Sequence, residues 1–283
     1  MKNIILNKTN VVNDGTNSRY KYSFNTTLQV NKGDTLSLVQ AQVPYSWINI
    51  SASQYNNNKF KYTTYDGTDY VITLDDGFYT TEDLNFALQY NMINNGHYLI
   101  NDAGLYVYYL EIETNKTLYK IQVNCYPVPA TLPSGWSNPA GWNLTTQAGR
   151  TMSISFLDNL SPNFRYLIGF NSGTYGANSL TKLSFVSAFA PIPHPVSSFI
   201  INCNLVNMAS VNLNTSSSLY GKTPDTEFGN NIIVSPNFPV SVDASEGYYN
   251  DLYVFLTDQL GNPLYLKDND VLFQLVLKQK NEF

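Results

Sequence analysis

Short stretches in which apolar and polar residues alternate are the feature that most constrains the fold of this chain. The alternation is clear over Tyr20–Phe24 and Thr35–Val43, and it is cleanest over Leu252–Leu256. A repeat of two residues places one set of side chains on a buried face and the other toward solvent, as in a half-buried β-strand. Turn sequences such as Asp66-Gly67 separate these stretches. Many short strands with irregular turn spacing predict a sandwich or a barrel.

Only one segment has the periodicity of an amphipathic helix. Thr80 is suited to cap the free N–H groups of a first turn, and two acidic residues follow where the helix dipole favours negative charge. Apolar residues recur at helical spacing from Leu84 to Met92, and Asn94–Gly96 is a stop signal. We therefore expect one short, one-sided helix that lies over an end or edge of a sheet.

These patterns together predict an all-β fold: a single jelly-roll sandwich with long loop elaborations and one short amphipathic helix. Residues 1–17 would form an N-terminal arm with a short β segment at Ile4–Leu6, and residues 18–283 would form the single domain. Its elaborated loops would lie at about 54–100, 127–150 and 207–240. The closely connected C-terminal strands suit a jelly roll, because the first and last strands of that fold can pair in one sheet.

The surface predicted from composition is polar but weakly charged. Charged residues make up 13% of the chain, about half the usual share, and Asn, Ser and Thr replace them. Such a surface is typical of subunits that pack side by side, although a secreted or lectin-like protein can also have it. The net charge of −5 argues against specific nucleic-acid binding, which needs a basic footprint.

The sequence gives no sign of a membrane span or a secretory signal. No run of about 18 apolar residues occurs, and the apolar run in the N-terminal MKNIILNKTNVV is too short for a signal peptide. We therefore expect folding in a cytosolic compartment. There, Cys125 and Cys203 are expected to be buried apolar residues and not a disulfide.

No residue pattern predicts a metal or another cofactor. Two cysteines and two histidines that are scattered along the chain do not make a zinc site, which needs four clustered ligands. The acidic segments Asp75–Gly77 and Asp268–Asp270 could offer oxygen ligands to calcium. Turn chemistry explains both equally well, because Asp and Asn side chains hydrogen-bond to nearby backbone. No cofactor is therefore expected.

The search for a catalytic site is also negative. His97 follows the helix stop and His194 lies in a Pro-rich segment, and neither neighbours a nucleophile turn. Glu111 and Glu113 can share one face of a strand, as a glycosidase pair would, but nothing selects them over a solvated face. The sequence therefore indicates a protein that is not an enzyme.

The candidate contact residues are aromatic. Trp136 and Trp142 lie in the Pro- and Gly-rich stretch 127–150, and a loop of this length is usually functional. Each tryptophan could anchor an interface, offer a stacking platform for a sugar, or simply plug its own loop. Tyr45 and Trp47, in the segment that leaves a strand after a proline, are the other two interface candidates.

Several segments, in this order, carry a resemblance to a known family. They are SRYKYSFN (Ser18–Asn25), LSLVQAQVPYSWINIS (Leu36–Ser51), DGFYTTEDLNFAL (Asp76–Leu88), FRYLIGF (Phe164–Phe170), SSFIINCNLVN (197–207) and YVFLTDQLGNPLYLKDNDVLFQLVLK (Tyr253–Lys278). The chain resembles the penton proteins of virophages and polinton-like viruses, the vertex proteins of small icosahedral double-stranded DNA viruses. The stretch 127–150 has no counterpart in this resemblance.

The resemblance implies a single jelly roll that stands upright in a viral shell. Five copies would close a vertex as a homopentamer, in contact with double-jelly-roll major capsid proteins and with minor capsid proteins. It implies a place in the virion, assembly in the host cytoplasm or a viral factory, and no enzyme activity. The alternatives are a minor or cement capsid protein of the same virus class, and a jelly-roll protein that binds carbohydrate or a receptor.

Overall fold

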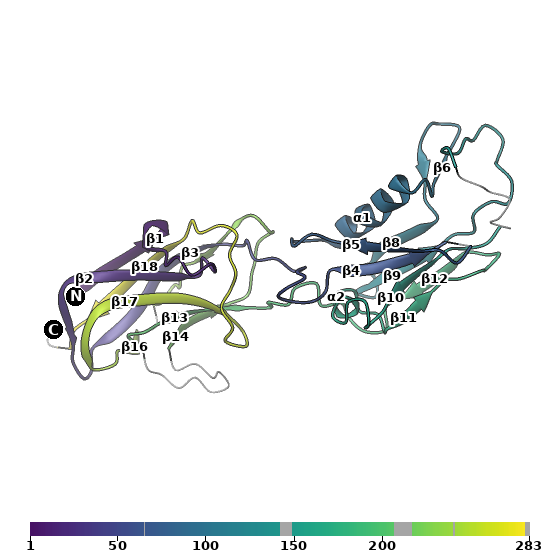
Figure 1. Ribbon diagram of the computed structural model, residues 1–283. Helices are drawn as coiled ribbons and strands as arrows, with labels where there is room; N and C mark the ends of the chain where they lie inside the picture. Colours follow the sequence, from purple (N-terminus) through teal and green to yellow (C-terminus); the bar gives the residue numbers. More distant parts are fainter. Residues whose placement is uncertain (65, 142–148, 207–216, 240, 281–283) are drawn as a thin grey trace. The chain divides into compact units, whose positions relative to one another are not determined.

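Two structural units make up the fold of this chain. The computed structural model describes residues 1–64, 66–141, 149–206, 217–239 and 241–280. Unit 1 comprises Met1–Trp47 and Val196–Phe283, and unit 2 comprises Ile48–Pro195 (Figure 1). Unit 2 is therefore an insertion in the sequence of unit 1.

Unit 1 contains two antiparallel sheets. The first has the order β1 (Lys2–Asn7), β18 (Leu272–Lys278), β3 (Thr35–Pro44) and β15 (Asn231–Val234), and β16 (Ser241–Asp243) also pairs with β3. The second has the order β14 (Ser218–Lys222), β13 (Phe199–Cys203), β17 (Gly247–Asp258) and β2 (Arg19–Val30). A short 3-10 turn, η1 (Lys8–Asn10), follows β1.

The strand order of unit 1 is that of a jelly roll. Its nine described strands occupy eight positions, because β15 and β16 pair with opposite ends of β3 along one edge. We number these positions from one to eight along the chain. From edge to edge, the first sheet then has the order one, eight, three, six, and the second has the order five, four, seven, two. The first and last strands are neighbours, since β1 pairs antiparallel with β18. The predicted all-β jelly-roll fold is therefore confirmed.

The N-terminal segment agrees with the prediction in part. The short β segment expected at Ile4–Leu6 is present, but it belongs to Lys2–Asn7, the first strand of the sandwich, and not to a separate arm. Ile4 and Leu6 point into the core and are 4% and 0% exposed, while Ile5 between them is 50% exposed. This period-2 burial stabilises the pairing of the strand with the sheet, because two apolar side chains are removed from water when it pairs.

The division into two units also differs from the single domain predicted over residues 18–283. The expected elaboration 54–100 contains the hairpin and the helix that were predicted, whereas the expected loop 207–240 contains the strands β14 and β15. Residues 207–216 and 240 lie outside the described residues. Period-2 patterns identify strands but not the sheet that each strand joins, so the sequence could not show that residues 48–195 build their own core.

Unit 2 has two larger sheets around one hydrophobic core. One sheet has the order β11 (Gly173–Tyr175), β10 (Ser153–Phe156), β4 (Lys59–Thr63) and β5 (Asp69–Thr73). The other has the order β12 (Leu183–Val186), β9 (Lys120–Cys125) and β8 (Leu110–Asn115). A small ribbon pairs β6 (Leu99–Ile100) with β7 (Tyr106–Val107). Inward side chains from both larger sheets belong to one buried cluster.

The predicted helix is present as α1 (Thr81–Asn94), and its N-terminus is capped as expected. Thr80 and Asp83 form a reciprocal capping box, in which each side chain bonds to the backbone N–H of the other. The helix runs beside β5 and β8 (Figure 1). The Asn85 side-chain oxygen accepts a hydrogen bond of 2.9 Å from the backbone N–H of Ile112 in the edge strand β8. The helix thus covers a sheet edge, as predicted.

A second, shorter helix was not predicted. The FRYLIGF segment, one of those that carry the family resemblance, forms α2 (Phe164–Ile168). Phe164, Leu167 and Ile168 are its buried residues, at the spacing of one helical face. Gly169 ends the helix with a left-handed φ of 79°. A β-carbon there would lie 2.3 Å from the carbonyl oxygen of Phe189, so only glycine fits this position.

Candidate functional site

The four predicted interface residues have different environments. Tyr45 and Trp47 are buried, with 4% and 3% of their surface exposed. Their ring centroids lie 4.6 Å apart, and they pack against Phe228 and Phe199 of unit 1 at 5.8 and 5.7 Å. Both are core residues in this structure and do not present a surface to a partner. Trp142 lies outside the described residues.

Trp136 is half-buried, and it lines a groove of unit 2 with a volume of about 580 Å³. This groove, the aromatic groove below, lies beside the end of the β8–β9 ladder. Its wall consists of Tyr106, Tyr108, Glu111, Tyr126 and several prolines of the following loop, and Gln89 of α1 contributes to it. The first part of the long 127–150 stretch is therefore folded against aromatic residues of the preceding strands.

Two tyrosines of the groove pack against the ring of Tyr98. The ring of Tyr98 lies 4.5 Å from that of Tyr106 and 6.4 Å from that of Tyr108. Tyr106 remains 47% exposed. The ammonium group of Lys182 lies 4.6 Å from the centre of the Tyr126 ring, within the range of a cation–π contact. Sequence reasoning missed these tyrosines, because they stand in strand-like sequence and carry no motif.

A polar cluster at one end of the groove holds two carboxylates in place. Tyr126 donates a hydrogen bond of 3.0 Å to Glu111 Oε2, and Asn124 Nδ2 lies 3.4 Å from the same oxygen. Asn124 and Gln122 also donate to Glu113 Oε1, at 2.7 and 2.8 Å. Glu111 and Glu113 therefore share one face, as predicted. Burial, together with nearby Glu111, raises the pKa of Tyr126, so its hydroxyl keeps its proton and donates.

Both histidines are engaged in ring contacts. His97 Nδ1 shares a hydrogen bond of 2.9 Å with the Tyr62 hydroxyl, and its ring meets Tyr70 edge-on at 4.6 Å. His194 stacks on Phe78, with ring centroids 5.3 Å apart. Burial lowers the pKa of each histidine below its ordinary value. These contacts fit the interpretation of both as packed histidines.

The acidic segments and the cysteines have structural surroundings. Asp76 accepts hydrogen bonds from the Ser51 hydroxyl and the Ala52 N–H, at 2.7 and 2.8 Å. Within the described ranges, no group of three or more His, Cys, Asp or Glu side chains could hold a metal ion. Cys125 and Cys203 are free and buried, and burial raises the pKa of each thiol to about 12. The prediction that they are buried and unpaired is confirmed.

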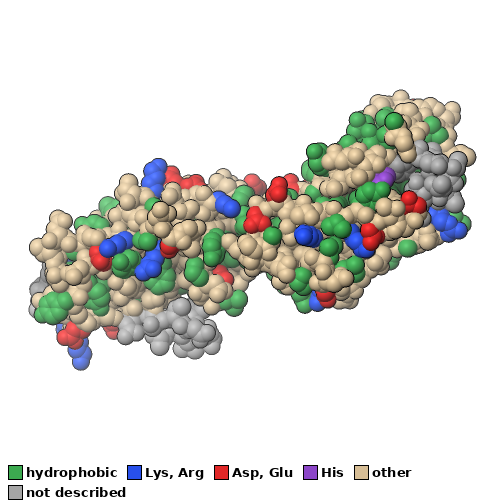
Figure 2. Space-filling view, viewed as in Figure 1, with side chains coloured by type: hydrophobic (Ala, Val, Ile, Leu, Met, Phe, Trp, Pro, Cys, Tyr) green, Lys and Arg blue, Asp and Glu red, His purple; other side chains and the backbone are tan. Residues whose placement is uncertain are grey.

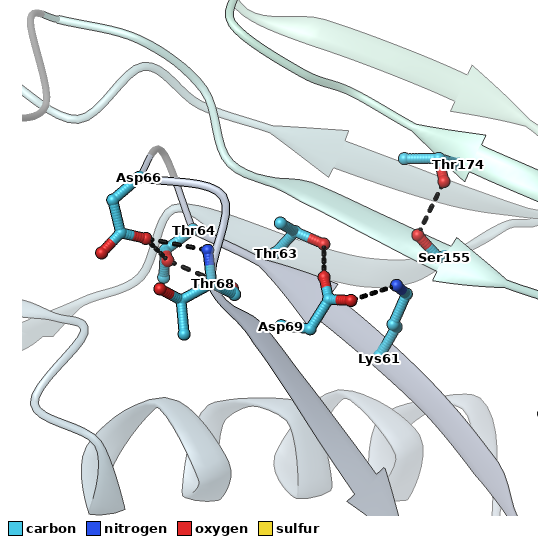
Figure 3. A network of polar contacts seen from close by, with 8 residues as sticks. All are labelled: Lys61, Thr63, Thr64, Asp66, Thr68, Asp69, Ser155 and Thr174. Atoms are coloured by element: carbon cyan, nitrogen blue, oxygen red, sulfur yellow. Dashed lines mark hydrogen bonds and ion pairs between the residues drawn. The ribbon is translucent and has the colours of Figure 1, made fainter.

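The outer face of the four-stranded sheet in unit 2 carries a polar network (Figure 3). Asp69 accepts from the Lys61 ammonium at 2.5 Å and from the Thr63 hydroxyl at 2.7 Å. These two contacts hold the pKa of the Asp69 carboxyl below its ordinary value. The Ser155 and Thr174 hydroxyls share a hydrogen bond of 2.8 Å across β10 and β11. The network pairs polar groups with one another along a flat sheet face.

In the part of the chain that the structure describes, neither helix is long and apolar enough to cross a membrane. On the face shown in Figure 2, neutral and hydrophobic side chains cover most of the surface, and charged ones are sparse. This distribution agrees with the 13% of charged residues in the sequence.

The chain is similar to proteins of known structure. Protein-family models do not match this chain, and neither do curated protein sequences. Among solved structures, the chain is similar to the crystal structure of the selenomethionine-labelled mavirus penton protein, with 12% sequence identity and a TM-score of 0.45. The similarity covers 98% of this chain and 97% of that protein. A TM-score of this size carries no argument by itself, so the fold assignment rests on the strand order of unit 1.

Proposed function

We propose that this chain is a structural capsid protein of a small icosahedral double-stranded DNA virus. Five copies would close a five-fold vertex, in lateral contact with a double-jelly-roll major capsid protein and with minor capsid proteins. The protein would reside in the virion after assembly in the host cytoplasm or a viral factory. It would act through assembly and not as an enzyme.

The observation that carries this proposal is the strand order of unit 1. Jelly rolls of two interleaved four-stranded sheets are common in viral capsid proteins, although lectins and cupins also use them. Four of the six segments that resemble penton proteins include parts of this framework, namely of β2, β3, β13, β17 and β18, and the other two lie in unit 2. The resemblance to penton proteins therefore includes strands of the jelly roll as well as segments of unit 2, which supports a capsid protein over other jelly-roll proteins.

The surface chemistry supports a role in assembly. A surface with few charges allows copies to pack side by side without strong repulsion, and a five-fold ring is a heterologous contact whose rotation closes. The residues considered for catalysis are used internally: His97 contacts two tyrosines, and Glu111 and Glu113 accept from neighbouring side chains. These contacts favour a structural function.

The test is to determine the oligomeric state of the full chain and its place in particles. Native mass spectrometry of the purified protein is expected to show pentamers, and a density map of the particle is expected to place the chain at the five-fold vertex. Trimers bound between major capsid proteins would point to a cement protein and contradict the vertex assignment. A stable monomer that is absent from purified particles would overturn the capsid proposal.

A further inference from the structure

We propose that the aromatic groove of unit 2 is a binding site for a neutral saccharide. The groove volume of about 580 Å³ lies within the roughly 300–1,000 Å³ of small-ligand pockets. Such pockets combine apolar and aromatic walls with a few placed polar groups, which describes this groove. The proposal goes beyond the capsid role and does not depend on it, because every lining residue belongs to unit 2.

The aromatic wall suits the apolar face of a sugar ring. A pyranose has C–H groups on its faces and hydroxyls around its rim, so it can stack on an aromatic face while its rim stays polar. Tyr106 is 47% exposed, and Tyr108 and Trp136 are partly exposed in the groove. Tyr98 packs against both Tyr106 and Tyr108. These rings are thus held in position before a ligand arrives, which lowers the entropy cost of binding.

The polar end of the groove suits the hydroxyls of the rim. Glu111 is an acceptor, and its hydrogen bonds to described residues both reach Oε2, from Tyr126 and Asn124. Its Oε1 therefore has capacity to accept from a sugar hydroxyl. The side-chain amide of Gln89, which also lines the groove, can both donate and accept. One fixed acceptor beside one adaptable amide matches a ligand that carries several hydroxyls.

The same groups argue against two other ligand classes. Glu111 is the charged side chain among the residues that line the groove, and it repels sialylated or sulfated sugars, so the saccharide is neutral; the Lys182 ammonium lies over the Tyr126 ring. Proline-rich peptides also dock in aromatic grooves, but their prolines lack N–H groups and offer mainly carbonyl acceptors. Those acceptors cannot pair with the Glu111 carboxylate, whereas hydroxyls can.

A glycan array tests the proposal with the labelled full chain. The array carries neutral hexose and N-acetylhexosamine glycans, sialylated and sulfated glycans, and immobilised proline-rich peptides. We expect binding to at least one neutral glycan, and competition by the same glycan in solution. Trp136→Ala and Tyr106→Ala are expected to weaken that binding at least about tenfold, and Glu111→Gln at least about fivefold. Tyr248→Ala, at a tyrosine of unit 1 that is 74% exposed, is the matched control and should bind like the original chain.

The variants also separate binding from folding. Trp136 packs against the core of unit 2, whereas Tyr106 is exposed, so Tyr106→Ala tests the groove with little risk to the fold. Thermal unfolding of each variant checks this point. Three results would overturn the proposal: binding to no neutral glycan, binding to acidic glycans or proline-rich peptides alone, or neutral-glycan binding that Tyr106→Ala and Glu111→Gln leave unchanged. A chain that forms pentamers and binds no glycan would reject this proposal and keep the capsid role.

Discussion

The side-chain amide of Asn49 donates a hydrogen bond of 2.9 Å to the carbonyl oxygen of Pro193. These residues lie near the two ends of unit 2, Ile48–Pro195. The two ends of unit 2 therefore lie close together. Insertions whose ends lie close together interrupt the host fold little, and such segments commonly fold alone.

We therefore predict that residues 48–195 fold as an isolated fragment. The fragment should unfold in one cooperative urea transition, because it contains a complete core of two sheets and α1. Unit 1 should also remain folded when a short Gly-Ser linker replaces the same residues. Circular dichroism and urea titration of both proteins test this. A fragment without a cooperative transition would favour the single domain predicted from sequence.

A second prediction concerns the first strand. Leu6 is fully buried and lies opposite Phe273, whereas Ile5 is 50% exposed in the same strand. Leu6→Ala should lower the free energy of unfolding by about 2–4 kcal/mol, through lost burial and a cavity. Ile5→Ala, the matched control, should change it by less than about 0.5 kcal/mol. Equal, small effects in urea titration would mean that residues 1–17 behave as a free arm.

Sequence reasoning predicted the elements of this fold better than their grouping. The hairpin around Asp66-Gly67 and the capped helix after Thr80 are local features, and both are present. Turns and helix caps depend on residues that are close together in the chain, so a single sequence is enough to predict them. The two-unit division depends on which strands share a core. For unit 2, the core residues are distributed along Ile48–Pro195, so no short stretch of sequence identifies them.

For the candidate site, too, the sequence predicted local features but not which distant residues lie together. Trp136 was found because a tryptophan in a Pro- and Gly-rich loop is conspicuous, and it does line the groove. Tyr106 lies in β7 and Tyr126 directly follows β9. Both line one groove because β8 pairs with β9, and no short motif encodes this pairing. Tyr45 and Trp47 stand in an equally conspicuous segment but are buried, because aromatic residues after a strand can fold back onto the core as well as face a partner.

A third prediction compares two glycines with the same backbone conformation. Gly169 and Gly104 have φ of +79° and +78°. A β-carbon at Gly104 would have no neighbour within 4 Å, whereas one at Gly169 would meet the Phe189 carbonyl. Gly104→Ala should therefore cost only the strain of a left-handed residue, about 1–2 kcal/mol. Gly169→Ala should cost about 1–3 kcal/mol more, through overpacking. Urea titrations in which the two variants lose equal stability would contradict this account of α2.

The last prediction concerns the pH dependence of unit 2. Burial lowers the pKa of His97 below its ordinary value of 6.5, and the nearby Asp66 charge opposes this only in part. The unfolded chain therefore binds a proton at higher pH than the folded chain does. As the pH falls through 6.5 toward the folded pKa, the free energy of unfolding decreases. One histidine contributes at most about 1.4 kcal/mol per pH unit.

Urea titrations of the chain between about pH 7.5 and about pH 5.5 measure this slope, in a range where carboxyls with ordinary pKa values stay ionised. We expect lower stability at the acidic end, and a smaller loss in His97→Gln. His194 has a pKa lowered by burial in the same direction, so the double variant His97→Gln, His194→Gln should show the flattest dependence. A His97→Gln variant with the slope of the original chain would show that His97 titrates alike in the folded and unfolded states, and that its contact with Tyr62 does not depend on the neutral ring.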